Sequence, residues 1–226
     1  HETGAAITLR CNHDAQSNSK SGLPGALNRY LHTAGLNREE LEDRVRKQLQ
    51  RHGVEDPFEL RALCDFLHQE NEASLSDLSL SMQFQSPDER LALLIRFLRR
   101  TACQRPVILW MDDVQWGDEA LMLAQRVQRL SDQEQLPVMI LMTLRDDLID
   151  DRPFEQQLIN ELDPAQTLQL AIAPLPDIDQ VALVEDMLGL EPKLARKVVS
   201  RSQGNPLFAI QLVGDWVQRG VLEIGK

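Results

Sequence analysis

Cysteine, long apolar runs and an excess of positive charge are scarce in this sequence or missing from it. The three cysteines, Cys11, Cys64 and Cys103, are odd in number, widely spaced and without a His or Cys partner at metal-ligand spacing. This pattern argues against a disulfide framework and against a zinc site. We expect all three to be small buried residues of a protein in a reducing compartment.

No apolar run approaches the ~20 residues that a membrane-spanning helix needs. The amino end also carries no charged segment followed by an apolar one, as a secretion signal would. The sequence therefore predicts a cytoplasmic protein without a membrane partner.

Basic residues are outnumbered, with 24 Lys and Arg against 35 Asp and Glu, a formal charge of −11. Such a charge repels nucleic acid, so we expect no direct nucleic-acid partner for this segment. The chain is 226 residues long and 42% apolar, which is enough for a proper core.

An apolar run from Val107 to Met111 ends in two adjacent carboxylates, Asp112 and Asp113. The run is too short for a capped helix and too uniform for a half-exposed strand, so it predicts a parallel strand covered on both faces. Its carboxyl end is where open α/β sheets place ligands. An acidic residue there can hold the Mg²⁺ of a nucleotide and its neighbour can orient the attacking water, but a solvated acidic turn also fits.

A second apolar run, Pro137 to Thr143, predicts another parallel strand, joined to the first by a helix that Asp118 caps and that runs through Leu130. The unit would be right-handed. Arg145 then lies at the same sheet edge as Asp112 and Asp113. It can reach the terminal phosphate of a nucleotide there or pair with the nearby aspartates, and the residues alone leave both open.

The remaining periodicities complete an α/β pattern followed by helices only. Alternating residues predict edge-type strands at 6–11 and 167–172, and we expect the first to pair in parallel with 107–111. Helical stripes occupy much of 26–67 and 86–98, and we expect Ser86 to cap the second of these stretches. A Ser-rich stretch, 70–85, is the predicted mobile insert. We place a domain boundary between residues 173 and 174, with a core over 1–173 and three lid helices over 174–226. The lid helices should pack on one another through Val181, Leu188, Val198, Ile210 and Val217.

Ser19-Lys20-Ser21 invites comparison with a phosphate-binding loop, but Asp14 and Ser19 hold the positions where that loop needs glycine. A solvated lysine is the better interpretation of Lys20. In the lid, Asn205-Pro206 reads on local chemistry as the ordinary start of a helix.

Four segments together carry a resemblance: Pro106–Trp116, Thr143-Leu144-Arg145, Arg201–Phe208 and Arg219–Leu222. They resemble the AAA-related ATPase module of the signal-transduction ATPases with numerous domains, a family of multidomain bacterial regulators. The resemblance implies a three-layer αβα P-loop core with a helical lid. By position it makes Asp112 the Walker B magnesium residue, Asp113 the water-orienting residue, Arg145 a sensor arginine, and Asn205-Pro206 a lid segment beside the nucleotide base.

The family's phosphate loop, with its strand and helix, should precede residues 6–11, and this sequence does not contain it. The strand count agrees, since the family's sheet order 5-1-4-3-2 needs a strand that is missing here. An open gap would leave backbone polar groups unpaired. We therefore expect a fragment of a longer protein whose first strand lies upstream.

These observations predict an ATP-binding and ATP-hydrolysing switch in a bacterial signal-transduction or transcription regulator, with ATP and Mg²⁺ as cofactors. The enzyme activity would belong to the full-length protein, with flanking effector domains as partners and assembly into a homo-oligomer left open. The alternative is a scaffold whose nucleotide site has degenerated and which mediates only protein–protein interaction.

Overall fold

The computed structural model describes residues 5–15, 21–68 and 86–222 of the chain. These residues form two compact units, His1–Thr167 and Leu168–Lys226. Each unit has its own apolar core. The division falls a few residues before the predicted boundary at residue 173. The segments that contain Lys20 and the predicted insert at 70–85 lie outside the described residues.

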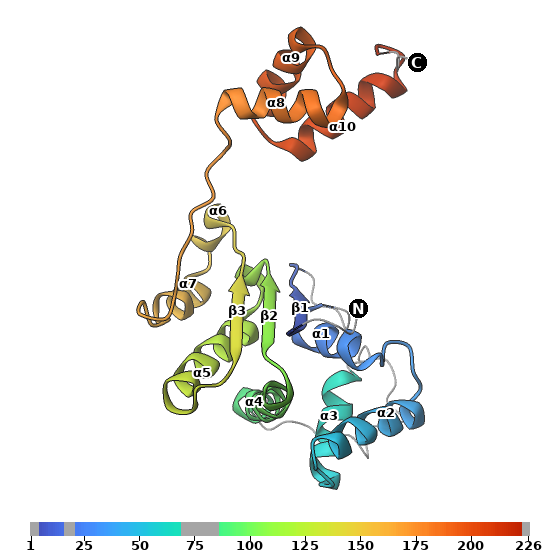
Figure 1. Cartoon of the computed structure of the whole chain (residues 1–226), viewed down its shortest axis with the longest axis vertical. Coiled ribbons are helices and arrows are strands. Elements are labelled where there is room, and N and C mark those ends of the chain that lie inside the picture. Colours follow the sequence, from blue (N-terminus) through green and yellow to red (C-terminus); the bar gives the residue numbers. More distant parts are fainter. Residues whose placement is uncertain (1–4, 16–20, 69–85, 223–226) are drawn as a thin grey trace. The chain divides into compact units, whose positions relative to one another are not determined.

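A three-stranded parallel sheet organises the first unit (Figure 1). Its strands are β1 (Ile7–Asn12), β2 (Val107–Asp112) and β3 (Val138–Met142), in the order β1-β2-β3. Leu9 pairs with Leu109, and Leu109 with Ile140. The predicted parallel pairing of residues 6–11 beside 107–111, and its place at the sheet edge, are therefore confirmed.

One face of this sheet carries the core. The helices α1 (Gly22–Leu31), α4 (Pro87–Gln104) and α5 (Asp118–Glu134) contribute apolar side chains that enclose alternate strand residues such as Leu9, Leu109 and Met111. Such burial is worth about 1.5–3 kcal/mol for each fully buried side chain of this size.

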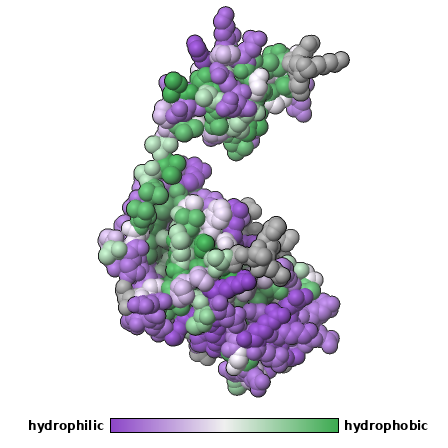
Figure 2. All heavy atoms as spheres, viewed as in Figure 1, coloured by the Kyte–Doolittle hydropathy of each residue, from purple (hydrophilic) through white to green (hydrophobic). Residues whose placement is uncertain are grey.

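In the described part of the chain the opposite face is largely exposed, and in the view of Figure 2 apolar residues gather over the sheet. Met139 and Leu141 are 61% and 44% exposed, and Ile108 and Trp110 are only half-buried. The prediction that β2 is covered on both faces is thus wrong for the described residues. A uniformly apolar sequence identifies a strand that can be covered on both faces. Whether the second face is covered depends on which other elements pack against it.

Two further helices extend the first unit, α2 (Arg38–Arg51) and α3 (Pro57–Leu67). Asn37 and Glu40 form a capping box at the start of α2, while Asp56 accepts a hydrogen bond from the Phe58 N–H at the start of α3. Ser86 likewise caps α4 through the Glu89 N–H. Helix α5 begins at Asp118 itself with Gly117 as its N-cap, so the predicted cap at Asp118 is off by one residue.

After β3 come two short helices that the sequence did not predict, α6 (Asp146–Ile149) and α7 (Pro153–Asn160). Helix α7 is fixed to α5 by the buried Gln125, whose Nε2 donates to the Leu158 carbonyl over 2.8 Å. The predicted strand at 167–172 is wrong, because these residues are irregular and exposed, with Ile172 at 91%. Alternation gives a strand two distinct faces, but a strand exists only through hydrogen bonds to a neighbour.

The second unit consists of α8 (Asp177–Leu188), α9 (Pro192–Ser202) and α10 (Pro206–Gln218). Val198 is fully buried, and Val181 and Leu188 pack against the same cluster, as predicted. Ile210 is 41% exposed, so its predicted place in the lid core is wrong. The buried positions of α10 are instead Ala209 and Val213.

Cys11 and Cys64 are buried and unpaired, as expected, whereas Cys103 is exposed near the end of α4. No helix among the residues that the structure describes is long and apolar enough to span a membrane.

Candidate functional site

The carboxyl ends of β2 and β3 meet at one edge of the sheet because the two strands are parallel. Asp112 is the last residue of β2, Asp113 follows it, and Arg145 comes just after β3. The structure therefore brings these three predicted residues to the same edge.

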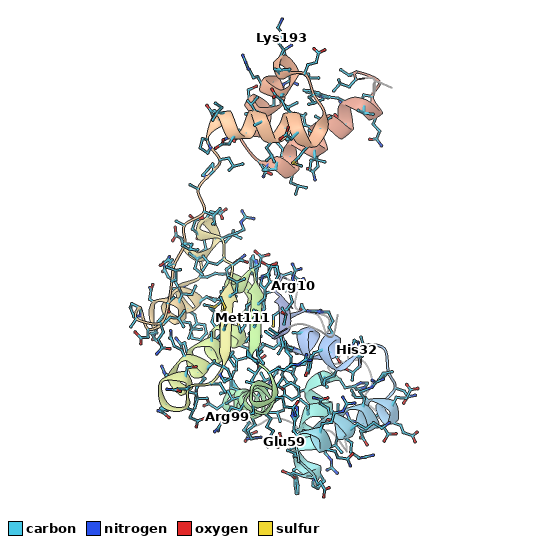
Figure 3. The ribbon with its side chains drawn as sticks, in the orientation of Figure 1. Arg10, His32, Glu59, Arg99, Met111 and Lys193 are labelled. Atoms are coloured by element: carbon cyan, nitrogen blue, oxygen red, sulfur yellow. The ribbon has the colours of Figure 1, made fainter. Side chains whose placement is uncertain are left out.

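The carboxylate of Asp112 is held from two sides. Its Oδ1 accepts a short hydrogen bond from the Thr143 hydroxyl, and its Oδ2 accepts from Arg10 over 3.3 Å. Arg10, which lies beside β2 (Figure 3), also places its guanidinium 4.4 Å from the centre of the Trp110 ring. A magnesium ion on Asp112 would therefore compete with Arg10 for this carboxylate.

Asp113 has a left-handed backbone, with φ 56° and ψ 48°. This region is uncommon for residues other than glycine, although aspartate tolerates it better than most. Two hydrogen bonds support the conformation: the Asp113 N–H donates to the Thr143 hydroxyl over 3.1 Å, and its Oδ1 accepts from Gln115 over 3.1 Å. A backbone held in this way at the end of a central strand is typical of functional sites.

The side chain of Arg145 points to Asp147. Its Nε lies 3.1 Å from one carboxylate oxygen and its terminal nitrogen 2.7 Å from the other. The hydrogen bond from Arg145 lowers the pKa of Asp147 below its ordinary value. Of the two roles that the sequence left open for Arg145, the structure displays pairing with a nearby aspartate.

A cavity of about 250 Å³ lies beside this edge, where β1 and β2 lead into α1 and α5. His13 lines this cavity and makes two hydrogen bonds to the Asp112 carbonyl. Its backbone N–H donates over 3.0 Å, and its ring Nδ1 donates over 2.9 Å. Glu119, also in the wall, is paired with Arg90 at 2.9 Å, and burial raises the pKa of the Glu119 carboxyl.

Four residues of this edge were not predicted: Arg10, His13, Gln115 and Thr143. Thr143 and Gln115 did carry a signal, since each is a polar residue directly beside an apolar strand or within the acidic motif. Arg10 and His13 carried none, because their contacts depend on the register of β1 against β2.

In the second unit, the Asn205 side chain accepts from the N–H groups of Leu207 and Phe208, over 3.0 and 3.2 Å. Pro206 is the first residue of α10. The local geometry is therefore that of a capped helix start, and the role of both residues toward a nucleotide base stays a prediction.

Within the residues that the structure describes, no group of three His, Cys, Asp or Glu side chains could hold a metal ion. The parallel sheet and its acidic carboxyl edge define an α/β protein whose polar groups converge where the strands end. Comparison with protein-family models, with curated proteins and with solved structures finds no match.

Proposed function

We propose that this chain is the nucleotide-hydrolysing switch module of a multidomain bacterial regulator, with ATP and Mg²⁺ as its ligands. One observation carries the proposal: adjacent Asp112 and Asp113 end the central strand of a parallel sheet, and the Thr143 side chain contacts both. Mg²⁺ is usually bound through one or two carboxylates, water and substrate phosphates, so Asp112 suffices as the protein ligand.

The roles follow from position. The magnesium ion would replace Arg10 as the partner of the Asp112 carboxylate. Asp113 would orient the attacking water. Arg145 would leave Asp147 for the terminal phosphate, where a cation stabilises the charge that develops during transfer. Asn205 and Pro206 would lie beside the base.

The phosphate-binding strand, loop and helix would come from polypeptide outside these 226 residues and would complete a three-layer P-loop core. Among the residues that the structure describes, no strand pairs with the outer edge of β3, which supports this idea. Two backbone hydrogen bonds, from Val107 N–H to the Pro137 carbonyl and from Thr143 N–H to the Met111 carbonyl, show which residues of this segment bond to β2. Because bonding residues alternate along a parallel strand, Ile140 and Met142 direct their backbone N–H and C=O groups away from β2.

The two outer strands of the sheet differ in how their edges are protected. β3 is uncharged throughout, although exposed edges are normally blocked by charge or proline. On β1, Arg10 adds a charge and its carbonyl accepts from the Arg29 side chain. The edge of β3 is therefore the one suited to a further strand.

The test is a titration of a fluorescent ATP analogue, with turnover measured in parallel, into the 226-residue chain and into a polypeptide extended by the residues that precede it. Backbone N–H groups and a lysine of the phosphate loop provide most of the phosphate affinity. We expect Mg²⁺-dependent binding only in the longer polypeptide. Tight binding by the shorter polypeptide would contradict the proposed need for an added loop. Lys20 would then again be a candidate for the phosphate-binding lysine.

The roles of the two aspartates are separable in the longer polypeptide. Asp112→Ala should weaken Mg²⁺-dependent binding about tenfold or more, because it removes a metal ligand, whereas Asp113→Asn should spare binding and slow turnover by about 10²-fold or more. Asp43→Asn, on the exposed surface of α2, is the control and should change neither. Equal loss of binding in both edge variants would refute the division of roles.

The competing function is that of a scaffold without nucleotide chemistry. Its specific support is that Asp112 and Arg145 are both engaged by protein side chains. A longer polypeptide that folds but binds no ATP would favour the scaffold.

A further inference from the structure

Gln115 is an almost completely buried amide, 1% exposed, between the loops that follow β2 and β3. Its Nε2 donates to Asp113 Oδ1 over 3.1 Å, and its Oε1 accepts from the Arg145 backbone N–H over 3.2 Å. The one side chain therefore contacts both loops that carry candidate residues.

The orientation of this amide is fixed by its partners. The backbone N–H of Arg145 can only donate, so the oxygen of Gln115 must face it, and an ionised Asp113 can only accept, so the nitrogen must face that residue. A buried polar atom that loses its partner pays its full desolvation penalty. Movement of either loop away from Gln115 is thus opposed by the other.

We propose that Gln115 is a positioning residue that couples the Asp113 turn to the Arg145 loop, so that the two open and close together. The left-handed backbone of Asp113 needs such support, because a non-glycine residue in this region persists only where its surroundings hold it. Thr143 provides a second link through the Asp113 N–H, whereas the Gln115 side chain bonds to both Asp113 and the Arg145 N–H.

The coupling would make the two loops one mechanical unit. Its consequence for turnover rests on the proposed function, since it would keep Asp113 in register with Arg145 during phosphoryl transfer. The coupling itself concerns only the described residues and can be tested without nucleotide.

Two substitutions separate the two hydrogen bonds. Gln115→Met keeps the volume and removes both bonds. Gln115→Glu keeps an acceptor for the Arg145 N–H but sets a carboxylate against Asp113. Gln125→Met is the matched control, because Gln125 is also a buried amide of the same unit but contacts Leu158 and Glu161.

The readout is hydrogen exchange of the Asp113 and Arg145 amides, expressed as protection factors. Gln115→Met should lower both factors about tenfold or more, because the Arg145 N–H loses its acceptor and the Asp113 turn loses one of its two supports. Gln115→Glu at pH 7 should lower the factor of Asp113 and leave that of Arg145 unchanged. Gln125→Met should leave both unchanged.

Unchanged protection of Arg145 in Gln115→Met would overturn the proposal, as would unchanged protection of Asp113 in both Gln115 variants. In the longer polypeptide, Gln115→Met should also lower kcat with little change in KM. Failure of that kinetic test alone, with the exchange results as expected, would count against the proposed function and leave the coupling standing.

Discussion

The buried thiols of Cys11 and Cys64 provide a test at the scale of single residues. Burial raises the pKa of each thiol to about 12, so neither forms the reactive thiolate near neutral pH. Iodoacetamide at pH 8 should therefore modify only the exposed Cys103 of the native chain, as counted by mass spectrometry.

The control is Cys103→Ser, which should leave no reactive thiol until denaturant is added. Modification of Cys64 in the native chain would show that the packing of α3 against the core is wrong.

Gly117 is required for a steric reason. A Cβ at this position would lie 2.6 Å from His13 Cδ2, although the backbone angle φ of −132° suits any residue. Gly117→Ala should displace the His13 ring from Asp112 and cost about 1–3 kcal/mol of unfolding free energy, measured by urea denaturation.

A double-mutant cycle identifies the cause, because His13→Ala removes the atoms that the new methyl group meets. Gly117→Ala should cost much less in that background. Equal costs in both backgrounds would rule out the ring contact as the origin.

At this edge, sequence reasoning could place Asp112, Asp113 and Arg145, because each follows an apolar strand directly and parallel strands end together. It could not find that Arg10 reaches Asp112, since these residues are far apart in the chain and meet only through the register of β1. Nor could it decide that Arg145 pairs with Asp147, because a choice between two nearby anions depends on the loop geometry.

At the scale of elements, helix starts were the most predictable features because caps act locally. Ser86 and Asn205 each bond to an N–H within three residues of their own position. The short helices α6 and α7 escaped prediction, since a helix of one or two turns shows too little periodicity to recognise.

Helix α10 contains Gly214 at an exposed position where an added Cβ meets no atom within 4 Å. Gly214→Ala should stabilise the second unit by about 0.5–1 kcal/mol, because alanine loses less backbone entropy in a helix. Thermal unfolding followed by circular dichroism measures the change.

Gly204→Ala, in the same unit, should have the opposite sign. Gly204 has a φ of +76°, and a Cβ there would lie 2.5 Å from Gln180 Nε2. Destabilisation by Gly214→Ala would mean that the exposed face of α10 is covered in solution.

At the scale of the whole molecule, the fold class and the parallel order of the strands were predictable, since they follow from apolar runs separated by helices. The bare sheet face and the irregular segment after Thr167 were not. Both depend on what packs against them, and a residue pattern specifies a face without supplying its partner.

The segment Leu168–Ile172 gives the last prediction. It is exposed, irregular and uncharged, and its three branched aliphatic residues suit a protease with apolar specificity. Brief thermolysin treatment of the 226-residue chain should therefore cut here before it cuts within any described helix or strand. The products should be two fragments that each retain helical circular dichroism, because each unit has its own core.

The alternating sequence of this segment can form a strand only when a neighbouring strand is present, because backbone hydrogen bonds to that strand then replace those to water. In a longer polypeptide that supplies a further strand, cleavage at Leu168–Ile172 should slow about tenfold or more, since proteolysis follows the population of the open form. Cleavage at the exposed Val221, after α10, is the internal control and should keep its rate. Equal cleavage of Leu168–Ile172 in both polypeptides would show that this segment is a permanent linker and that its strand-like pattern has no structural role.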